Sequence, residues 1–344
     1  MALLEVENLH TRFQTDDGVV KAVSGVSFKV DRGKTLGVVG ESGSGKSVTF
    51  LTVMGLVDRK NAQVEGSVRY DGEDLLHASS SRLQHIRGSR IGMIFQDPMT
   101  SLNPVKKIGW QLEEAVLLHN DVPRAEARRR AIQALEEVEI PRSDTRVDDY
   151  PHQFSGGMRQ RVMIAMALIN QPEVIIADEP TTALDVTTQA QILRLMNKLQ
   201  DEHGAAIVMI THDLGVVAEL ADDVLVMYGG RVVEEANVDD LFALPEMPYT
   251  WGLLGSMPRL DQVASRLEQI PGQPPSLLHP PSGCAFNPRC AYAFDKCREQ
   301  LPELAAARGK SDHRYRCHLD DAERERIWTA KKAALAATIE GSAA

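Results

Sequence analysis

One octapeptide constrains the fold of this 344-residue chain more than any other stretch, Gly40-Glu41-Ser42-Gly43-Ser44-Gly45-Lys46-Ser47. It fits the phosphate-loop pattern G-x-x-x-x-G-K-[S/T] at every fixed position. An apolar run at residues 36–39 predicts a buried strand before it, and residues 48–54 predict a helix with an apolar face after it. In such a strand–turn–helix unit, backbone N–H groups and a helix N-terminus point at one anion. A surface turn that matched the pattern by accident would not need both flanks, so the octapeptide predicts a nucleoside-triphosphate site.

The residue types of this loop suit the groups of a nucleotide. Its three glycines let the backbone curl round a phosphate without a Cβ clash. We expect Lys46 to reach the β- and γ-phosphates and the Ser47 hydroxyl to take a Mg²⁺ position. The predicted nucleotide-binding set is Gly40, Glu41, Ser42, Gly43, Ser44, Gly45, Lys46 and Ser47.

A second element supplies two carboxylates at the end of an apolar strand. Residues 174–177 are Val-Ile-Ile-Ala, and Asp178 and Glu179 follow. A nucleotide hydrolase needs one carboxylate for the Mg²⁺ shell and another group that orients and deprotonates the attacking water. We assign Asp178 to the first role and Glu179 to the second. Acidic pairs are common on exposed turns, but this pair follows a fully apolar strand in a chain with a phosphate loop.

The first half of the chain predicts β-structure followed by a helical insertion. Residues 3–35 partly alternate apolar and polar side chains, and Asp16-Asp17-Gly18 supplies a hairpin turn. Residues 64–70 and 91–95 read as further strands. Residues 104–170 then carry apolar side chains at helical spacing among charged residues, which predicts a helical insertion.

The second half predicts a parallel sheet and then a change of character. Short apolar strands at 174–177, 205–210 and 224–227 alternate with helices, which favours a parallel sheet covered on both faces. After about residue 236, frequent prolines predict little regular structure, and a charged, Ala-rich stretch at 320–339 predicts a peripheral closing helix.

Composition excludes several classes of protein. The formal net charge of −10 argues against a nucleic-acid footprint over the whole chain. No apolar run approaches the roughly 20 residues that a membrane span needs. Residues 1–5 lack a basic segment followed by an apolar core, so no signal peptide is predicted. We therefore expect the chain to stay in the cytoplasm and to reach a membrane only through a partner.

A third element opens a predicted helix at residues 158–170. Residues 154–161 read Phe-Ser-Gly-Gly-Met-Arg-Gln-Arg, and a Ser-Gly-Gly turn at a helix start is a second anion-binding N-terminus. The alternative is a plain helix cap, for which Ser155 is well suited. With this element, residues 3–236 resemble an ABC-transporter nucleotide-binding subunit, and Phe154–Met158 corresponds to the signature motif of that family.

The resemblance implies a fold and a paired site. It implies an α/β P-loop NTPase (ABC ATPase) with a central mostly parallel sheet, an antiparallel β subdomain and a helical subdomain at about 97–170. In such proteins two subunits pair head to tail. Each ATP then lies between the phosphate loop of one chain and the signature of the other, here Ser155, Gly156 and Gly157.

Lesser motifs of the family follow in the expected order. Gln96 matches the glutamine that senses Mg²⁺ and the γ-phosphate, and the loop after it would link nucleotide state to the transport partner. Ala183-Leu184-Asp185 matches the loop that crosses the dimer interface, and His212 matches the switch histidine at the γ-phosphate. Phe13 is the candidate for stacking on adenine, although a Phe near a strand end usually belongs to the core.

Other phosphate-loop families fit less well. A GTPase would need an Asn-Lys-x-Asp guanine reader, and Asn197-Lys198-Leu199-Gln200 fails that pattern. A chromosome-organising or DNA-repair relative would insert a long coiled coil between the phosphate loop and the signature. A translation-type relative would normally carry two cassettes, and this sequence has one.

Several stretches are similar to the ATPase subunits of oligopeptide/dipeptide importers and their nickel-importing cousins. They include Phe95–Pro104, Ala177–Asp185, and Met247-Pro248-Tyr249, which stands where the family usually has His-Pro-Tyr. Met158 resembles the D-type rather than the F-type subunit. The resemblance therefore implies a heterodimer with an F-type ATPase, with a homodimer as the alternative.

All four cysteines lie late in the chain, at Cys284, Cys290, Cys297 and Cys317. A cytosolic ATPase makes structural disulfides improbable. Zinc sites usually contain a C-x2–4-C knuckle, which is absent here. The wide spacing suits a [4Fe–4S] cluster better, and related subunits imply the same. Zinc stays the alternative, with His313 and His318 close enough in sequence to substitute as ligands.

These observations predict an ATP- and Mg²⁺-dependent hydrolase that energises import of di- or oligopeptides. We expect residues 1–236 to form the ATPase domain and residues 237–344 a C-terminal extension with the four-cysteine site. Implied partners are the second ATPase, two integral membrane permease subunits and an extracytoplasmic substrate-binding protein, with no nucleic acid. The expected location is the cytoplasmic face of the cell membrane. Import of nickel or another small solute, and a soluble ABC ATPase acting on nucleic acid or ribosomes, are the alternatives.

Overall fold

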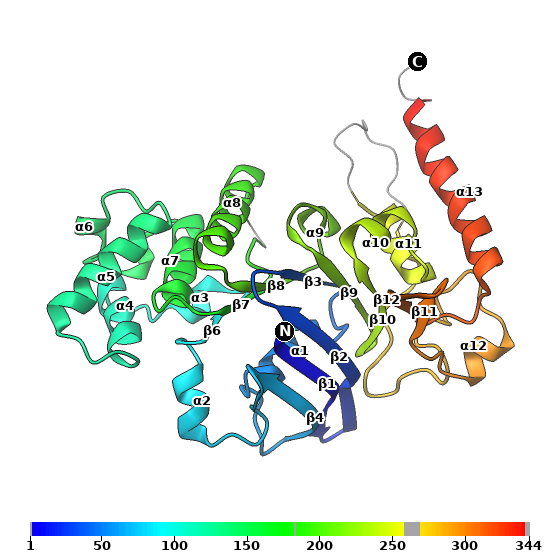
Figure 1. The fold of residues 1–344 in the computed structure, drawn as a ribbon, viewed down its shortest axis with the longest axis horizontal. Coiled ribbons are helices and arrows are strands. Elements are labelled where there is room, and N and C mark those ends of the chain that lie inside the picture. The colour runs from blue at the N-terminus through cyan, green and yellow to red at the C-terminus, as the bar shows by residue number, and fades with distance from the viewer. Residues whose placement is uncertain (1, 182–183, 258–268, 341–344) are drawn as a thin grey trace.

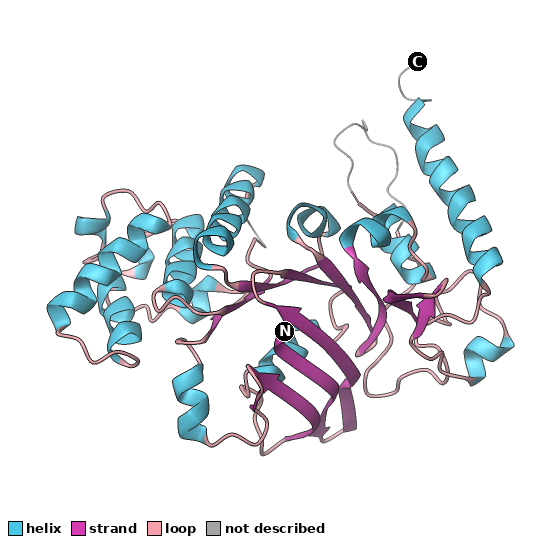
Figure 2. Cartoon of the chain, in the orientation of Figure 1, coloured by secondary structure: helices cyan, strands magenta, loops and turns pink. Residues whose placement is uncertain are grey.

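The computed structural model describes residues 2–181, 184–257 and 269–340. Two sheets organise them, and helices gather around the larger sheet (Figures 1 and 2). The smaller sheet has the order β2-β1-β4-β5, and the larger has the order β11-β12-β10-β9-β3-β8-β7-β6. No helix in the described ranges has the length and apolar character that crossing a membrane requires.

The strands of the smaller sheet are antiparallel and come from the N-terminal quarter. They are β1 (Ala2–Thr15), β2 (Gly18–Asp31), β4 (Ala62–Tyr70) and β5 (Glu73–Asp74). The predicted turn joins β1 to β2, and Thr15 pairs with Gly18 across it. The predicted β-structure in this part of the chain is confirmed.

The larger sheet has a parallel centre and an antiparallel edge. Its parallel strands are β3 (Thr35–Val39), β6 (Ile91–Ile94), β7 (Val174–Asp178), β8 (Ala206–Thr211) and β9 (Asp223–Tyr228). Every residue of β3, β7 and β8 is buried, as expected for strands covered on both faces. The antiparallel edge consists of β10 (Arg231–Asn237), β12 (Lys310–Tyr315) and β11 (Ala305–Ala307).

Helices form a compact group beside one end of this sheet, at the left of Figure 1. They are α3 (Pro98–Ser101), α4 (Ile108–Leu117), α5 (Arg124–Glu137), α6 (Ser143–Arg146), a 3-10 turn at Pro151–Gln153 and α7 (Gly156–Leu168). The short helix α2 (Ser80–Ile86) lies below this group in Figure 1. Leu112, Leu135 and Val162 from α4, α5 and α7 share one apolar core with Ile175 of β7. The predicted helical insertion is confirmed.

The phosphate loop lies where two apolar cores meet. Helix α1 (Lys46–Val53) buries Phe50 and Val53 between the smaller sheet and the larger one. On the opposite face, α8 (Val186–His203) and α9 (Leu214–Leu220) cover the sheet. The fold prediction of an α/β P-loop NTPase with an antiparallel subdomain is therefore confirmed.

The C-terminal part has more regular structure than its prolines predicted. It contains α10 (Val238–Ala243), α11 (Pro248–Gly255), α12 (Asp295–Glu299), α13 (Asp321–Glu340) and the two edge strands β11 and β12. Pro248 occupies the first turn of α11, where its missing N–H costs no hydrogen bond. The expectation of little regular structure was wrong for these segments but holds for the described residues between α11 and α12, which contain no helix or strand, and the closing helix is confirmed.

Candidate functional site

The sheet order brings the predicted site residues to one edge. Strands β3, β8, β7 and β6 are parallel neighbours, so their carboxyl ends lie side by side. The phosphate loop follows β3, Asp178 ends β7, His212 follows β8 and Gln96 follows β6 by two residues. Ligands of open α/β sheets bind at this edge. Four segments that are far apart in sequence therefore meet at one place.

The loop and the β7 carboxylate are joined directly. The Ser47 hydroxyl donates to Asp178 Oδ1 at 3.0 Å. The Lys46 ammonium donates to the carbonyl oxygens of Gly40 at 2.5 Å and Glu41 at 3.0 Å, so it lies folded back over its own loop. A hydroxyl and a carboxylate oxygen side by side are the hard oxygen donors that Mg²⁺ prefers. Ser47 and Asp178 therefore fit the predicted metal position.

Burial disfavours the charged forms of both Asp178 and Lys46. Desolvation, with a contribution from the charge of Glu179, raises the pKa of Asp178 above its ordinary value, although the Ser47 hydrogen bond and Lys46 lower it. Desolvation likewise lowers the pKa of Lys46, against the attraction of nearby carboxylates. Charged groups held at such an energetic disadvantage are typical of functional sites.

Glu179 lies at the centre of a small polar group. Its Oε2 accepts a hydrogen bond from Gln96 Nε2 at 3.0 Å, and its Oε1 lies 3.5 Å from His212 Nδ1. The backbone of Glu179 has a φ of 48°, which is unusual for a residue with a side chain. Its amide donates to the Ile210 carbonyl at 2.8 Å, which holds that conformation in place. The structure brings together the three residues predicted for catalysis.

Two loop glycines are required by close backbone contacts. A Cβ on Gly40 would lie 2.2 Å from the Met227 carbonyl oxygen, and one on Gly45 would lie 2.5 Å from the Ala22 carbonyl oxygen. Both have positive φ angles, 149° and 99°. The loop is thus packed against the sheet tightly enough that a side chain at either position would displace backbone.

The signature turn forms the exposed start of α7. Ser155 caps α7 and accepts from the Met158 amide at 3.3 Å, as the alternative interpretation expected. Ser155 and Gly156 are exposed, and Gly156 has open space where a Cβ would lie. An exposed helix start is available to an anion, so the cap and the anion site are compatible.

Two other predicted residues have structural partners. Asp185 caps α8 by accepting from the Thr188 amide at 2.9 Å, and Ala183, in the same predicted motif, lies outside the described residues. Phe13 pairs with Val20 and packs partly buried against the core of the smaller sheet. Their predicted contacts with nucleotide and partner stay predictions.

Two residues that sequence reasoning missed hold the phosphate loop from outside. Tyr249 of α11 accepts a hydrogen bond from the Glu41 amide at 2.8 Å. Arg289, 248 positions after Glu41, pairs with its carboxylate through two hydrogen bonds of 2.5 and 3.0 Å. No local sequence pattern joins residues so far apart. Tyr249 belongs to the Met-Pro-Tyr stretch, and the family resemblance of that stretch gives no indication of a contact with the phosphate loop.

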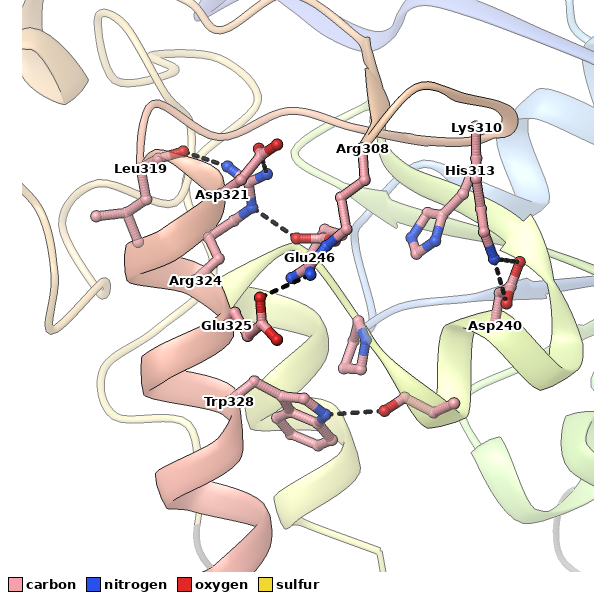
Figure 3. A network of polar contacts seen from close by, with 12 residues as sticks. Asp240, Glu246, Arg308, Lys310, His313, Leu319, Asp321, Arg324, Glu325 and Trp328 are labelled. Carbon is pink, nitrogen blue, oxygen red and sulfur yellow. Dashed lines mark hydrogen bonds and ion pairs between the residues drawn. The ribbon is translucent and has the colours of Figure 1, made fainter.

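A buried ionic network joins separate segments of the C-terminal extension to one another (Figure 3). The Glu246 carboxylate accepts hydrogen bonds from Arg308 Nε at 2.9 Å and from Arg324 Nε at 2.7 Å. Glu246 and Arg324 are almost completely buried. Beside it, His313 Nε2 lies 2.8 Å from the buried carboxylate of Glu234. His313 therefore already has a partner and is not placed as a substitute metal ligand.

The four cysteines lie near one another without forming a recognisable metal site. The Cys284 amide donates to the Cys297 carbonyl at 2.8 Å, and Cys284, Cys290 and Cys317 pack against one apolar cluster. Burial raises the pKa of Cys290 to about 11 and that of Cys317 to about 12, and neighbouring cysteines add to both shifts. Within the described residues, no group of three or more His, Cys, Asp or Glu side chains is arranged to hold a metal ion.

Comparison with known proteins agrees with this geometry. Residues 23–182 match the family model "ABC transporter", and residues 233–297 match "Oligopeptide/dipeptide transporter, C-terminal region". The chain is 52% identical over 296 residues to the oligopeptide transport ATP-binding protein OppD of Haemophilus influenzae, covering 86% of this chain and 91% of that protein. It is 54% identical over 302 residues to the dipeptide transport ATP-binding protein DppD of Lactococcus lactis, covering 87% and 86%.

Solved structures support the same assignment. A dimeric ATP-binding cassette in a post-hydrolysis state with ADP and Pi has a TM-score of 0.62 and 29% identity, and the match covers 68% of this chain and 98% of that one. The phosphate loop, the carboxylates after β7 and the two family matches all lead to one conclusion. The chain belongs to the ABC-transporter ATP-binding proteins of the oligopeptide/dipeptide type.

Proposed function

We propose that this chain binds and hydrolyses ATP to energise import of di- or oligopeptides through an ABC transporter complex. The observation that carries the proposal is the meeting of the phosphate loop with Gln96, Asp178, Glu179 and His212 at one sheet edge. The names of the relatives DppD and OppD support peptides over nickel or another small solute. They also favour transport over a role on nucleic acid or ribosomes.

The residues divide the work of hydrolysis among themselves. Lys46 would exchange its two carbonyl partners for phosphate oxygens, and Ser47 and Asp178 would hold Mg²⁺. The bound ion would neutralise charge on the phosphates. Glu179 would orient and deprotonate the attacking water, with Gln96 and His212 holding its two carboxylate oxygens.

A Glu179→Gln variant tests this division. It should bind MgATP with nearly unchanged affinity and lose turnover by about 100-fold or more, because a positioned general base contributes about 10²–10⁴-fold. Isothermal titration and phosphate release measure the two quantities. Unchanged turnover would remove Glu179 from its proposed role.

A second ATPase chain is needed to complete the site in this proposal. The exposed Ser155–Gly157 turn would face the phosphate loop of an F-type partner, and Asp185 would lie at their interface. The dimeric state of the solved cassette supports pairing in general. With ATP and Glu179→Gln, sedimentation should show a dimer only after the F-type chain is added. A dimer formed by this chain alone would favour the homodimer instead.

A groove beside Gln96 suits the permease subunits. A pocket of about 600 Å³ lies between α1, β6, α4 and α7, and its lining includes Phe95, Leu102 and Met163. Leu118 at its rim is 72% exposed and Phe95 is 39% exposed. Apolar side chains gathered at a groove are typical of protein-binding surfaces. We propose that the permease docks there, at the cytoplasmic face of the membrane, and that the substrate-binding protein acts through it.

Substitution in the groove tests the docking surface. Phe95→Ser with Leu118→Ser should abolish copurification of the permease while leaving the ATP affinity of the isolated chain unchanged. Leu301→Ser is a matched control, because Leu301 is similarly exposed at 41% but lies in the C-terminal extension. Equal recovery of the permease with the double variant and the control would contradict the proposal.

We also propose the division at residue 236 and a [4Fe–4S] cluster, or zinc, on the four cysteines. The separate family matches, at residues 23–182 and 233–297, support a change of region near that residue. The mutual effects of Cys284, Cys290 and Cys317 on their pKa values support a common location for the thiols. The side-chain arrangement itself does not fit a metal site, so ligation would require the thiols to turn. Iron and zinc analysis of purified protein, with visible absorbance that bleaches on reduction, decides between cluster, zinc and neither.

A further inference from the structure

We propose that Arg289 is a positioning residue of the phosphate loop, acting through Glu41. This inference rests on the proposed function and deepens it, because it makes part of the C-terminal extension a component of the nucleotide site. The contact that carries it joins the second residue of the phosphate loop to a segment 248 positions later.

The guanidinium group of Arg289 donates five hydrogen bonds. Its Nη1 donates to Glu41 Oε2 at 2.5 Å and to the Tyr228 hydroxyl at 3.3 Å, and its Nη2 donates to Glu41 Oε1 at 3.0 Å. Its remaining donors reach the carbonyl oxygens of Pro271 at 2.8 Å and Ile270 at 3.2 Å. These five acceptors match the five N–H groups of an arginine. The Arg289 side chain is 5% exposed and the Glu41 side chain 27%, so the arginine is buried and the carboxylate is partly shielded from solvent.

Glu41 is held at three of its groups, two of them by the extension. Arg289 holds the carboxylate, the Tyr249 hydroxyl accepts from the amide at 2.8 Å, and Lys46 donates to the carbonyl at 3.0 Å. The last contact matters because Lys46 is the residue that must reach the phosphates. The backbone that orients Lys46 is therefore fixed from the extension.

The ion pair with Arg289 also neutralises the negative charge of Glu41 beside the phosphate site. An unpaired carboxylate within the loop would repel a triphosphate that carries several negative charges, and the partial shielding of Glu41 from solvent strengthens that repulsion relative to bulk water. Arg289 neutralises that carboxylate and orients it by a bidentate pair. Lysine has three donors on a compact ammonium and cannot reproduce the planar geometry.

Arg289→Gln should raise the Kd for MgADP and the KM for MgATP about tenfold, as expected from losing a charge-assisted hydrogen bond. The kcat should stay within about twofold, since Glu179 is untouched and the lost interaction supports binding alone. Arg289→Lys should recover part of the affinity. Arg308→Gln is the matched control, because Arg308 pairs with a buried carboxylate in the same extension without contacting the phosphate loop (Figure 3).

A double-mutant cycle separates positioning from general stability. In the Glu41→Gln background the carboxylate is gone, so adding Arg289→Gln should change the Kd less than twofold. Independent, multiplicative effects of the two substitutions would overturn the inference, and so would an Arg289→Gln variant that binds MgADP as tightly as the wild type. If the wild-type chain binds neither MgADP nor MgATP, the proposed function fails first and the inference fails with it.

Discussion

The tight packing of the phosphate loop predicts that its glycines differ sharply in their tolerance of a methyl group. Gly45 has a φ of 99°, and a Cβ there would lie 2.5 Å from the Ala22 carbonyl oxygen and 3.2 Å from Gly230 Cα. Gly43 has a φ of 76°, and a Cβ there would have no atom within 4 Å. The two positions share the backbone strain, and Gly45 alone adds a collision with backbone.

The magnitudes follow from these contacts. A left-handed backbone costs an L-residue about 1–2 kcal/mol, and this is the whole expected effect of Gly43→Ala on the free energy of unfolding. Overpacking adds about 1–3 kcal/mol, so Gly45→Ala should lose about 2–5 kcal/mol. Urea unfolding of both variants without nucleotide measures the difference. Equal losses for the two variants would refute the claim that backbone contacts, rather than φ alone, fix Gly45.

Three further predictions concern buried groups. Burial raises the pKa of Asp178 above 3.8, so the native state holds a proton that the unfolded state has lost, and stability falls as pH rises through the raised value. Without nucleotide or Mg²⁺, Asp178→Asn should therefore gain stability relative to wild type as pH rises from below 3.8 to 8 in urea unfolding; a pH-independent difference would contradict this. Trp328 is 5% exposed and donates to the Ala243 carbonyl at 3.1 Å, so Trp328→Ala should lose about 3–5 kcal/mol by the same assay, and a loss below about 1 kcal/mol would mean that α13 does not anchor there. Because the edge strand β12 pairs with β10, calorimetry should show a single unfolding transition, and two separate transitions would refute that coupling.

Local patterns sufficed to predict the phosphate loop and the carboxylates after β7. The loop carries its own conformational requirements, and an apolar strand followed by Asp178 and Glu179 places both acids at a sheet edge. The sequence order alone could not give the distance of 3.0 Å between Ser47 and Asp178, but parallel pairing of β3, β8 and β7 made the meeting predictable.

The contacts of the C-terminal extension could not be predicted in this way. Arg289 reaches Glu41 across 248 positions, and nothing in the residues around either one indicates the other. Strand β12 was not predicted either, because its partners are β10, which lies far earlier in the chain, and the three-residue strand β11. Long-range pairs of this kind depend on the completed fold and leave no periodic pattern in the sequence.

The buried carboxylate of Glu234 shows why the extension and the cassette belong to one folding unit. Glu234 lies in β10, before the proposed boundary at residue 236, and is 0% exposed. Its partners all come from beyond that boundary: the amides of Glu246 and Met247, the Thr250 hydroxyl, and His313. An ionised carboxylate without such donors would destabilise a buried strand by several kcal/mol. We therefore infer that the boundary marks a change in composition, while β10 reaches its buried position only when the extension has folded against it.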